Sequence, residues 1–223
     1  LPLENDREAA RRALGLDPGA PVLALLPGSR RNEVRFMGAT FLEAVTLLCQ
    51  RHTELQVVIP AATAQRYTEL GELLAGYPTL AQRVTLLEGQ AREAMVASDA
   101  VLLTSGTAAL EAMLCHRAML VAYKMAPATH WLAKRLVKTQ WISLPNLIAQ
   151  ESVVPELIQH AATPEAIAEQ ISQLLSDAKT RHALEARFAA MHATLQRTAS
   201  ERAAQAITAL VAGEPLEAKP DGD

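Results

Sequence analysis

The chain has 223 residues, half of them hydrophobic and only 4% aromatic, so it can bury one large or two small cores built mainly of Leu, Val, Ala and Ile. Its formal net charge is −3 and its acidic and basic residues are interspersed, which excludes a broad positively charged surface for nucleic acid. No apolar run approaches the roughly 20 residues that a membrane-spanning helix needs.

Helix and strand signals alternate along the first 160 residues. We predict strands over residues 21–26, 55–59, 83–87, 100–103, 118–123 and 141–144. We predict helices over residues 5–14, 33–50, 63–75, 91–97 and 127–138, and a further helix that begins at Thr107. Apolar strands that alternate with helices indicate an α/β fold with a Rossmann-like, doubly wound parallel sheet. The loops that follow its strands should gather at one edge, where ligands bind in such sheets: 27–32, 88–92, 104–107, 123–127 and 145–147.

Beyond residue 160 the apolar residues follow helical spacing only. They form three stripes: Ile167, Ile171, Leu174 and Leu175; then Leu184, Phe188, Met191 and Leu195; then Ile207, Leu210 and Val211. We therefore predict a Rossmann-like domain over 1–160 and C-terminal helices over 161–212. The segment 213–223 is rich in Pro, Gly and charge, and we predict that it is a disordered tail.

Cysteines and the first residues indicate the setting of the chain. Cys49 and Cys115 lie among apolar residues, which predicts buried thiols rather than a disulfide and is typical of a reducing compartment. No Cys/His cluster has the spacing of a metal site. Residues 1–4 look like neither an initiator start nor a signal peptide, so we expect the chain to be part of a longer protein.

The turn after the fourth predicted strand has the features of a phosphate site. An apolar strand runs through Ser105, Gly106 and Thr107 into a helix, whose free N–H groups and dipole favour an anion. Glu111 lies four residues after Thr107 on the same helix face, where a carboxylate can accept hydrogen bonds from two ribose hydroxyls. Together these residues predict a nucleotide site. The structural alternative is a capped helix whose small residues allow close packing on the sheet.

A second turn of this kind follows the first predicted strand. Gly28 permits close backbone approach, Ser29 offers a hydroxyl, and Arg30 offers a planar fork for phosphate oxygens. An ordinary strand-to-helix turn with solvated arginines is the alternative. Two such turns at one sheet edge favour a phosphate ligand more strongly than either turn does alone.

Two other segments and two carboxylates are weaker candidates. Asn146, after the last predicted strand, can bond a base or a sugar hydroxyl, but a turn in which it satisfies its own backbone is favoured. Residues 123–138 join Tyr123 to a basic helix with Trp131, which suits anionic lipid or a diphosphate; a solvated amphipathic helix is slightly favoured. Glu88 and Glu93 lie near the ligand edge, but neither is a clear general base, and we find no nucleophile elbow and no metal-binding acidic pair.

Five segments taken together resemble the lipid-A-disaccharide synthases. They read LLPGSRxxEV over residues 25–34, REAMxASDA over 92–100, SGTAALE over 105–111, WLAKRLVK over 131–138 and SLPNL over 143–147. Their order and spacing are compatible with that family over about residues 1 to 212, and a match of five segments is specific where one would not be.

This resemblance implies a GT-B-type glycosyltransferase, in which two Rossmann-like domains face each other across a cleft. It implies transfer of 2,3-diacylglucosamine from its UDP carrier to 2,3-diacylglucosamine 1-phosphate (lipid X), which gives the β(1→6) disaccharide of lipid A and UDP. The chain would be the C-terminal, donor-binding half, peripheral on the cytoplasmic face of the inner membrane of Gram-negative bacteria. Its last helices would pack on the missing N-terminal domain, or on a partner subunit in a homodimer, and would therefore expose their apolar faces here.

The resemblance also implies roles for individual residues. Ser29 and Arg30 would hold the diphosphate, and Arg30 would stabilise the charge on the departing UDP. Ser105, Gly106 and Thr107 would donate to phosphate and Glu111 would bind the ribose. Further expected contacts with the donor, the cleft or the membrane are Gly28, Ala108, Tyr123, Lys134, Arg135 and Asn146. No metal or other cofactor is expected, and the general base would lie in the missing half.

Two other functions remain open at this point. One is a UDP-sugar epimerase of similar fold, in which the basic helix would have no membrane role. The other is a nucleotide-binding module without catalysis, which an isolated half-enzyme can be. A purely structural helical scaffold is the weakest hypothesis, because it leaves two phosphate-type turns at one edge unexplained.

Overall fold

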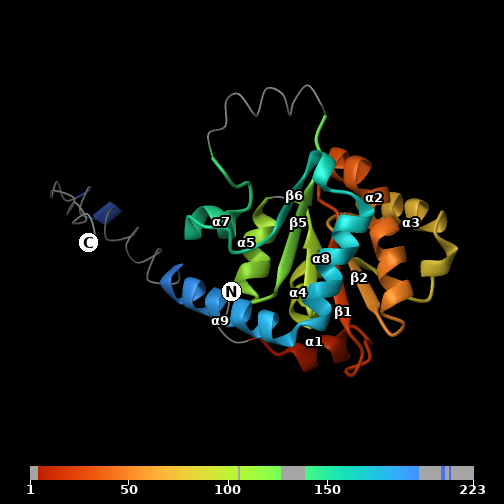
Figure 1. The fold of residues 1–223 in the computed structure, drawn as a ribbon, viewed down its shortest axis with the longest axis horizontal. Coiled ribbons are helices and arrows are strands. Elements are labelled where there is room, and N and C mark those ends of the chain that lie inside the picture. Colours follow the sequence, from red (N-terminus) through yellow and green to blue (C-terminus); the bar gives the residue numbers. More distant parts are fainter. Residues whose placement is uncertain (1–4, 105, 127–138, 196–206, 209–210, 212–223) are drawn as a thin grey trace.

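The computed structural model describes residues 5–104, 106–126, 139–195, 207–208 and 211. Six parallel strands form one sheet in the order β3-β2-β1-β4-β5-β6 (Figure 1). The strands are β1 Val22–Leu26, β2 Gln56–Ala61, β3 Val84–Glu88, β4 Ala100–Leu103, β5 Met119–Tyr123 and β6 Glu156–Ile158. The order reverses direction between β1 and β4, as it does in doubly wound nucleotide-binding sheets, so the predicted fold class is confirmed.

Helices cover both faces of this sheet. They are α1 Arg7–Ala13, α2 Arg31–Arg51, α3 Ala64–Ala75, α4 Ala91–Ala97, α5 Thr107–Leu114, α7 Leu144–Ala149, α8 Pro164–Ser176 and α9 Ala178–Leu195. Two short 3₁₀ helices span Pro78–Leu80 and Gln159–Ala161. None of the helices in the described ranges is long and apolar enough to cross a membrane.

Alternate residues of each strand feed two separate cores, because successive side chains of a strand point to opposite faces. Leu23 and Leu25 of β1 pack with α2, α3 and α8, whereas Val22 and Ala24 of the same strand pack with α4 and α5. Burial on both faces explains why the strands read as continuous apolar runs. Both cysteines are free. Cys115, the C-cap of α5, is buried, and this burial raises the pKa of its thiol.

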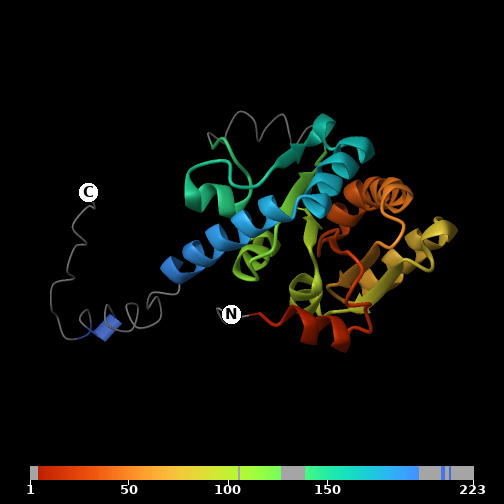
Figure 2. The same ribbon diagram turned by 60° about the horizontal axis from the view of Figure 1, so that its bottom comes forward.

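The apolar residues of α8 and Phe188 of α9 are covered within this chain, contrary to our expectation that these faces would be exposed, whereas Leu195 at the end of α9 is 41% exposed. Ile167 and Ile171 of α8 are fully buried in the core that α2 shares with the sheet, and Phe188 of α9 is fully buried in the other core. Figure 2 shows α9 alongside α5. Of the third stripe, Ile207 and Val211 are 63% and 83% exposed, and Leu210 lies outside the described residues, as does the tail 213–223.

The predicted sixth strand over 141–144 is wrong. Glu156 instead accepts hydrogen bonds from the backbone N–H groups of Ile142 and Ser143, and α7 begins at Leu144. Pro145 suits the first turn of a helix, because its fixed φ matches and its missing N–H would have had no partner there. The last strand is β6, whose three residues are only half-buried and give a weak sequence signal. The predicted helix 127–138 lies outside the described residues.

Candidate functional site

A pocket of about 340 Å³ opens at the carboxyl edge of the sheet, where the strand order reverses. The ends of β1 and β4 lie side by side there, since Leu26 pairs with Leu103 and the N–H of Thr104 donates to the carbonyl of Leu26. The lining residues come from four strand ends and the turns after them: Leu26, Gly28, Ser29, Arg30, Glu33, Pro60, Ala61, Ala62, Gly89, Ala91, Thr104, Gly106, Thr107, Ala108 and Glu111. A crevice at this point of a doubly wound sheet is the usual place for a ligand.

The first wall is the turn between β1 and α2. Gly28 has a φ of +112°, a conformation that L side chains rarely adopt, and a Cβ at this position would lie 2.4 Å from the Cβ of Glu33. Glu33 folds back over the start of its own helix, where one carboxylate oxygen accepts the backbone N–H of Arg30 at 3.1 Å. The other oxygen lies 3.3 Å from the Arg30 guanidinium, whose side chain is 82% exposed.

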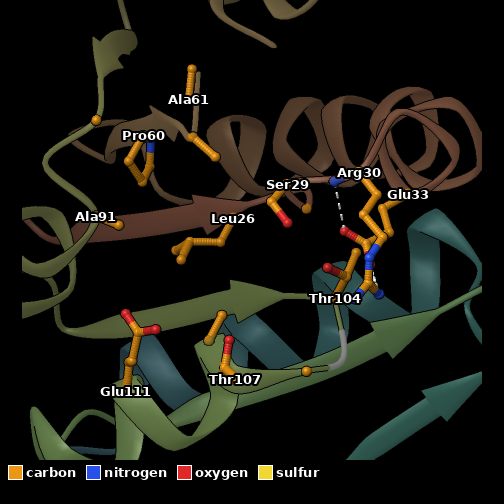
Figure 3. A pocket seen from close by; sticks show the side chains of 15 residues that line it. Leu26, Ser29, Arg30, Glu33, Pro60, Ala61, Ala91, Thr104, Thr107 and Glu111 are labelled. Carbon is orange, nitrogen blue, oxygen red and sulfur yellow. Dashed lines mark hydrogen bonds and ion pairs between the residues drawn. The ribbon is translucent and has the colours of Figure 1, made fainter.

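The second wall is the turn between β4 and α5. Gly106 has a φ of +119°, and nothing lies within 4 Å of where a Cβ would stand. The N-cap, Gly106, has no side chain to cap the start of α5, no other described residue forms a side-chain cap bond there, and the first turn holds no acidic residue. The positive end of this helix therefore faces the pocket uncompensated by these groups. Thr107 and Glu111 project from the same face of α5 into the pocket (Figure 3).

The charged groups of the pocket stand at opposite ends. Figure 3 shows Glu111 at one end, Arg30 with Glu33 at the other, and Thr107 between them. The remaining wall is formed by small side chains from the end of β2 and the start of α4, such as Ala61 and Ala91, which leave the space open. This arrangement suits a ligand with hydroxyls at one end and a multivalent anion at the other.

The pocket collects most of the site residues predicted from the sequence. Gly28, Ser29, Arg30, Gly106, Thr107, Ala108 and Glu111 all line it. Ser105, Lys134 and Arg135 lie outside the described residues. Tyr123, at the end of β5, is half-buried and does not line the pocket, and neither do the exposed Glu88 and Glu93.

Asn146 is held in another part of the fold. Its side chain is fully buried in α7 and does not line the pocket. Its amide group donates to the carbonyl of Val154 and to Glu156, and its carbonyl oxygen accepts the N–H groups of Val153 and Val154. These bonds occupy the side chain in joining α7 to the segment before β6. These partners lie seven to ten residues further along the chain rather than in the local turn of the structural alternative, and the contact with a donor stays a prediction.

Sequence reasoning overlooked Glu33 as a pocket residue. Its signal was present, because a Glu three residues after the N-cap of a helix is the pattern of a capping box. Thr104 lies in the predicted ligand loop 104–107 but was not named as a site residue, and the small residues at 60–62 were missed, since nothing in their types indicates a ligand. No group of three or more His, Cys, Asp or Glu side chains that could hold a metal ion occurs in the part of the chain that the structure describes.

Comparison with known proteins assigns the family. Residues 1–207 match the family of lipid-A-disaccharide synthetases. The chain belongs to this family. It is 63% identical to the lipid-A-disaccharide synthase of Chromohalobacter salexigens over 99% of its own length and 57% of that protein. It is 49% identical to the enzyme of the same name from Pseudomonas putida strain W619, over 95% of the chain and 54% of the relative. The chain thus spans about half the length of these family members.

Solved structures at low identity share the fold. A sucrose-phosphate synthase from Thermosynechococcus elongatus matches with a TM-score of 0.64 at 15% identity, over 95% of this chain and 51% of that one. WaaG, a glycosyltransferase involved in lipopolysaccharide biosynthesis, matches at 0.55 and 18%, over 91% and 50%. A putative UDP-N-acetylglucosamine 2-epimerase from Listeria monocytogenes matches at 0.60 and 16%, over 92% and 48%. These matches confirm the expected Rossmann-like fold, which this chain shares with about half of each of these proteins.

Proposed function

We propose that this chain is the donor-binding half of a lipid-A-disaccharide synthase. The whole enzyme would transfer 2,3-diacylglucosamine from UDP-2,3-diacylglucosamine to 2,3-diacylglucosamine 1-phosphate, with release of UDP. The observation that carries the proposal is the pocket at the β1/β4 switch point, where Arg30, the open N-terminus of α5 and Glu111 follow one another. Membership of the family supports the sugar donor and the acceptor that the resemblance implies.

A nucleoside diphosphate fits the order of groups in the pocket. Its ribose hydroxyls would donate to Glu111, and its diphosphate would lie against the N–H groups at the start of α5, near Thr107. Arg30 would meet the phosphate that carries the sugar. A volume of about 340 Å³ lies within the range of small-molecule sites, about 300 to 1,000 Å³.

The proposed transfer assigns a role to these positions. The 6-hydroxyl of the acceptor attacks the anomeric carbon from the face opposite the phosphate, the bond from that carbon to the phosphate oxygen breaks, and the configuration inverts. The negative charge that grows on the leaving phosphate is stabilised by Arg30 and by the dipole of α5. We assign the base that takes the hydroxyl proton to the missing half, as the resemblance implies; of the carboxylates that line the pocket, Glu33 is bonded to Arg30 and Glu111 is assigned to the ribose.

The proposal also assigns contacts between this half and the N-terminal domain, the membrane and a second subunit. Its N-terminal domain would close the cleft and bind the acceptor, and the basic segment with Lys134 and Arg135 would contact anionic lipid on the cytoplasmic face of the inner membrane. The exposed side chains of Ile207 and Val211 give the end of the chain an apolar surface suited to the N-terminal domain or to a second subunit.

Calorimetric titration with UDP tests the donor site. Arg30→Ala should weaken UDP by about tenfold and leave uridine unaffected, since a hydrogen bond to a charged group contributes about 1.5–3 kcal/mol. Arg31→Ala is the matched control, because Arg31 is exposed beside Arg30 and does not line the pocket. Glu111→Ala should weaken the binding of UDP more than that of 2′-deoxy-UDP, which keeps only one of the two hydroxyls.

The outcomes separate the candidate functions. Absence of UDP binding by the folded chain would contradict the donor site. UDP binding that Arg30→Ala and Glu111→Ala leave unchanged would place the nucleotide elsewhere. Conversion of a UDP-sugar to its epimer by the chain would favour the epimerase hypothesis, and formation of disaccharide only after addition of the N-terminal half would support the transferase.

A further inference from the structure

The two phosphate-type turns of the pocket differ in a way that the sequence alone does not show. At the start of α5 the pocket meets a helix end whose N-cap is Gly106, where no described side chain forms a cap bond and the first turn holds no acidic residue. At the start of α2 the carboxylate of Glu33 already occupies the cap position, bonded to the N–H of Arg30. A ligand phosphate at α2 would face this carboxylate, so α5 is the helix that offers its dipole to the anion.

Glu33 is built into the turn and does not swing freely. Its side chain is only 9% exposed, and it lies so close beneath the turn that a Cβ on Gly28 would stand 2.5 Å from one carboxylate oxygen. The absence of a side chain at position 28 is therefore what leaves room for the carboxylate. Main-chain and side-chain contacts fix both of its oxygens at the mouth of the pocket.

The carboxylate of Glu33 forms its hydrogen bonds with Arg30. The backbone N–H and one guanidinium nitrogen of Arg30 both bond to Glu33, at 3.1 and 3.3 Å, while the rest of the long side chain is exposed. A guanidinium has five N–H donors in a planar fork, so one contact to Glu33 leaves others for a phosphate. An arginine held in this way loses less conformational freedom when its ligand arrives.

We propose that Glu33 is a positioning residue, which holds the guanidinium of Arg30 at the pocket so that its remaining donors meet the diphosphate. This inference rests on the proposed function, because the diphosphate is that of the sugar donor. The carboxylate touches neither the nucleotide nor the reacting atoms. Its effect on binding passes through Arg30 alone, and that dependence is what distinguishes positioning from a general structural role.

A double-mutant cycle measured by calorimetry tests the dependence. Glu33→Gln keeps the length of the side chain and an oxygen for the Arg30 N–H, but it removes the charge that holds the guanidinium. We expect Glu33→Gln to raise the Kd for UDP about three- to tenfold, the range for ordering one long side chain, and to leave the Kd for uridine unchanged. In an Arg30→Ala background the same change should alter the UDP Kd by less than about twofold. Glu88→Gln, an exposed carboxylate at the same sheet edge, controls for net charge.

Each contrary result has its own meaning. If Glu33→Gln weakens UDP equally with and without Arg30, the role is structural and the inference is overturned. If it tightens UDP beyond the effect of Glu88→Gln, the carboxylate repels the diphosphate and the inference is also overturned. Failure of the wild-type chain to bind UDP would instead contradict the proposed function, on which the inference rests.

A second measurement needs no change at Glu33. Nitrogen-15 relaxation of the arginine side chains in the wild-type chain should show the Arg30 Nε–H more ordered than that of Arg31, which is exposed on the next residue and forms no ion pair among the described residues. Equal mobility of the two groups would overturn the positioning role, whatever the stability of the Glu33 variants.

Discussion

The replacement of Asn146 by alanine separates two interpretations of that residue. The family resemblance assigns Asn146 to the donor, whereas the structure shows it fully buried with four hydrogen bonds to Val153, Val154 and Glu156. Two of these bonds, both to the backbone of Val154, are buried. Each buried group left without a partner costs about 1–3 kcal/mol, and water can reach the part-buried pair. We therefore expect Asn146→Ala to lower the free energy of unfolding by about 2–6 kcal/mol.

Urea denaturation followed by circular dichroism measures this loss, and calorimetry below the unfolding temperature measures UDP binding by the folded variant. We expect stability to fall and the UDP Kd to stay within about twofold of wild type. Asn32→Ala, at an exposed position in the first turn of α2, should change neither. A variant with wild-type stability and UDP binding weakened tenfold or more would refute the structural reasoning and restore the contact with the donor.

Two further predictions concern a glycine and a histidine. Gly28→Ala should destabilise the chain by about 2–4 kcal/mol, because its φ is +112° and the new Cβ would stand 2.4 Å from that of Glu33. Gly15→Ala, at a φ of +67° with nothing within 4 Å, should cost only about 1 kcal/mol, and equal losses in urea denaturation would contradict the contact. His116 lies 3.0 Å from a histidine of α9, and burial, with that neighbour, lowers its pKa below the ordinary 6.5. The unfolded chain therefore binds a proton first as pH falls below about 6.5, so that the free energy of unfolding should decrease from pH 7.5 to 5.5, less steeply in His116→Asn. The exposed His182→Gln variant should keep the wild-type slope, and identical slopes in all three proteins would refute the assignment.

Most of the sheet could be predicted because its strands are buried on both faces. Five of the six strands were placed to within two residues, and α4 and β4 match the predicted bounds. The prediction of the sixth strand was wrong because of a contact that the sequence pattern does not show. Residues 141–144 have apolar character, but Glu156, distant in sequence, binds their backbone and leaves no ladder for them to join. A half-buried strand of three residues is too short to show a period of its own.

The pocket was predictable in part because phosphate-type turns have local signals. Glycine at positive φ, an arginine fork and a helix start can each be recognised in the sequence, and Gly28, Arg30, Gly106 and Glu111 line the pocket as predicted. Glu33 was missed because a Glu at that position can serve as a helix cap alone or can also position a pocket residue. A Glu in the first turn of a helix is common as a cap, and only the fold shows that the cap also holds Arg30 at the pocket mouth.

The sequence by itself determined the α/β class, the parallel sheet and the two turns at its carboxyl edge, because these follow from apolar periodicity and from the conformations that glycine and proline allow. Tertiary structure alone decided three other matters. It buried α8 and α9 against the cores of this chain, since only packing shows which apolar stripe finds a partner. It placed Asn146 in a buried hydrogen-bond network and Glu33 in contact with Arg30, since a polar side chain bonds to the partners that the fold brings within hydrogen-bond distance.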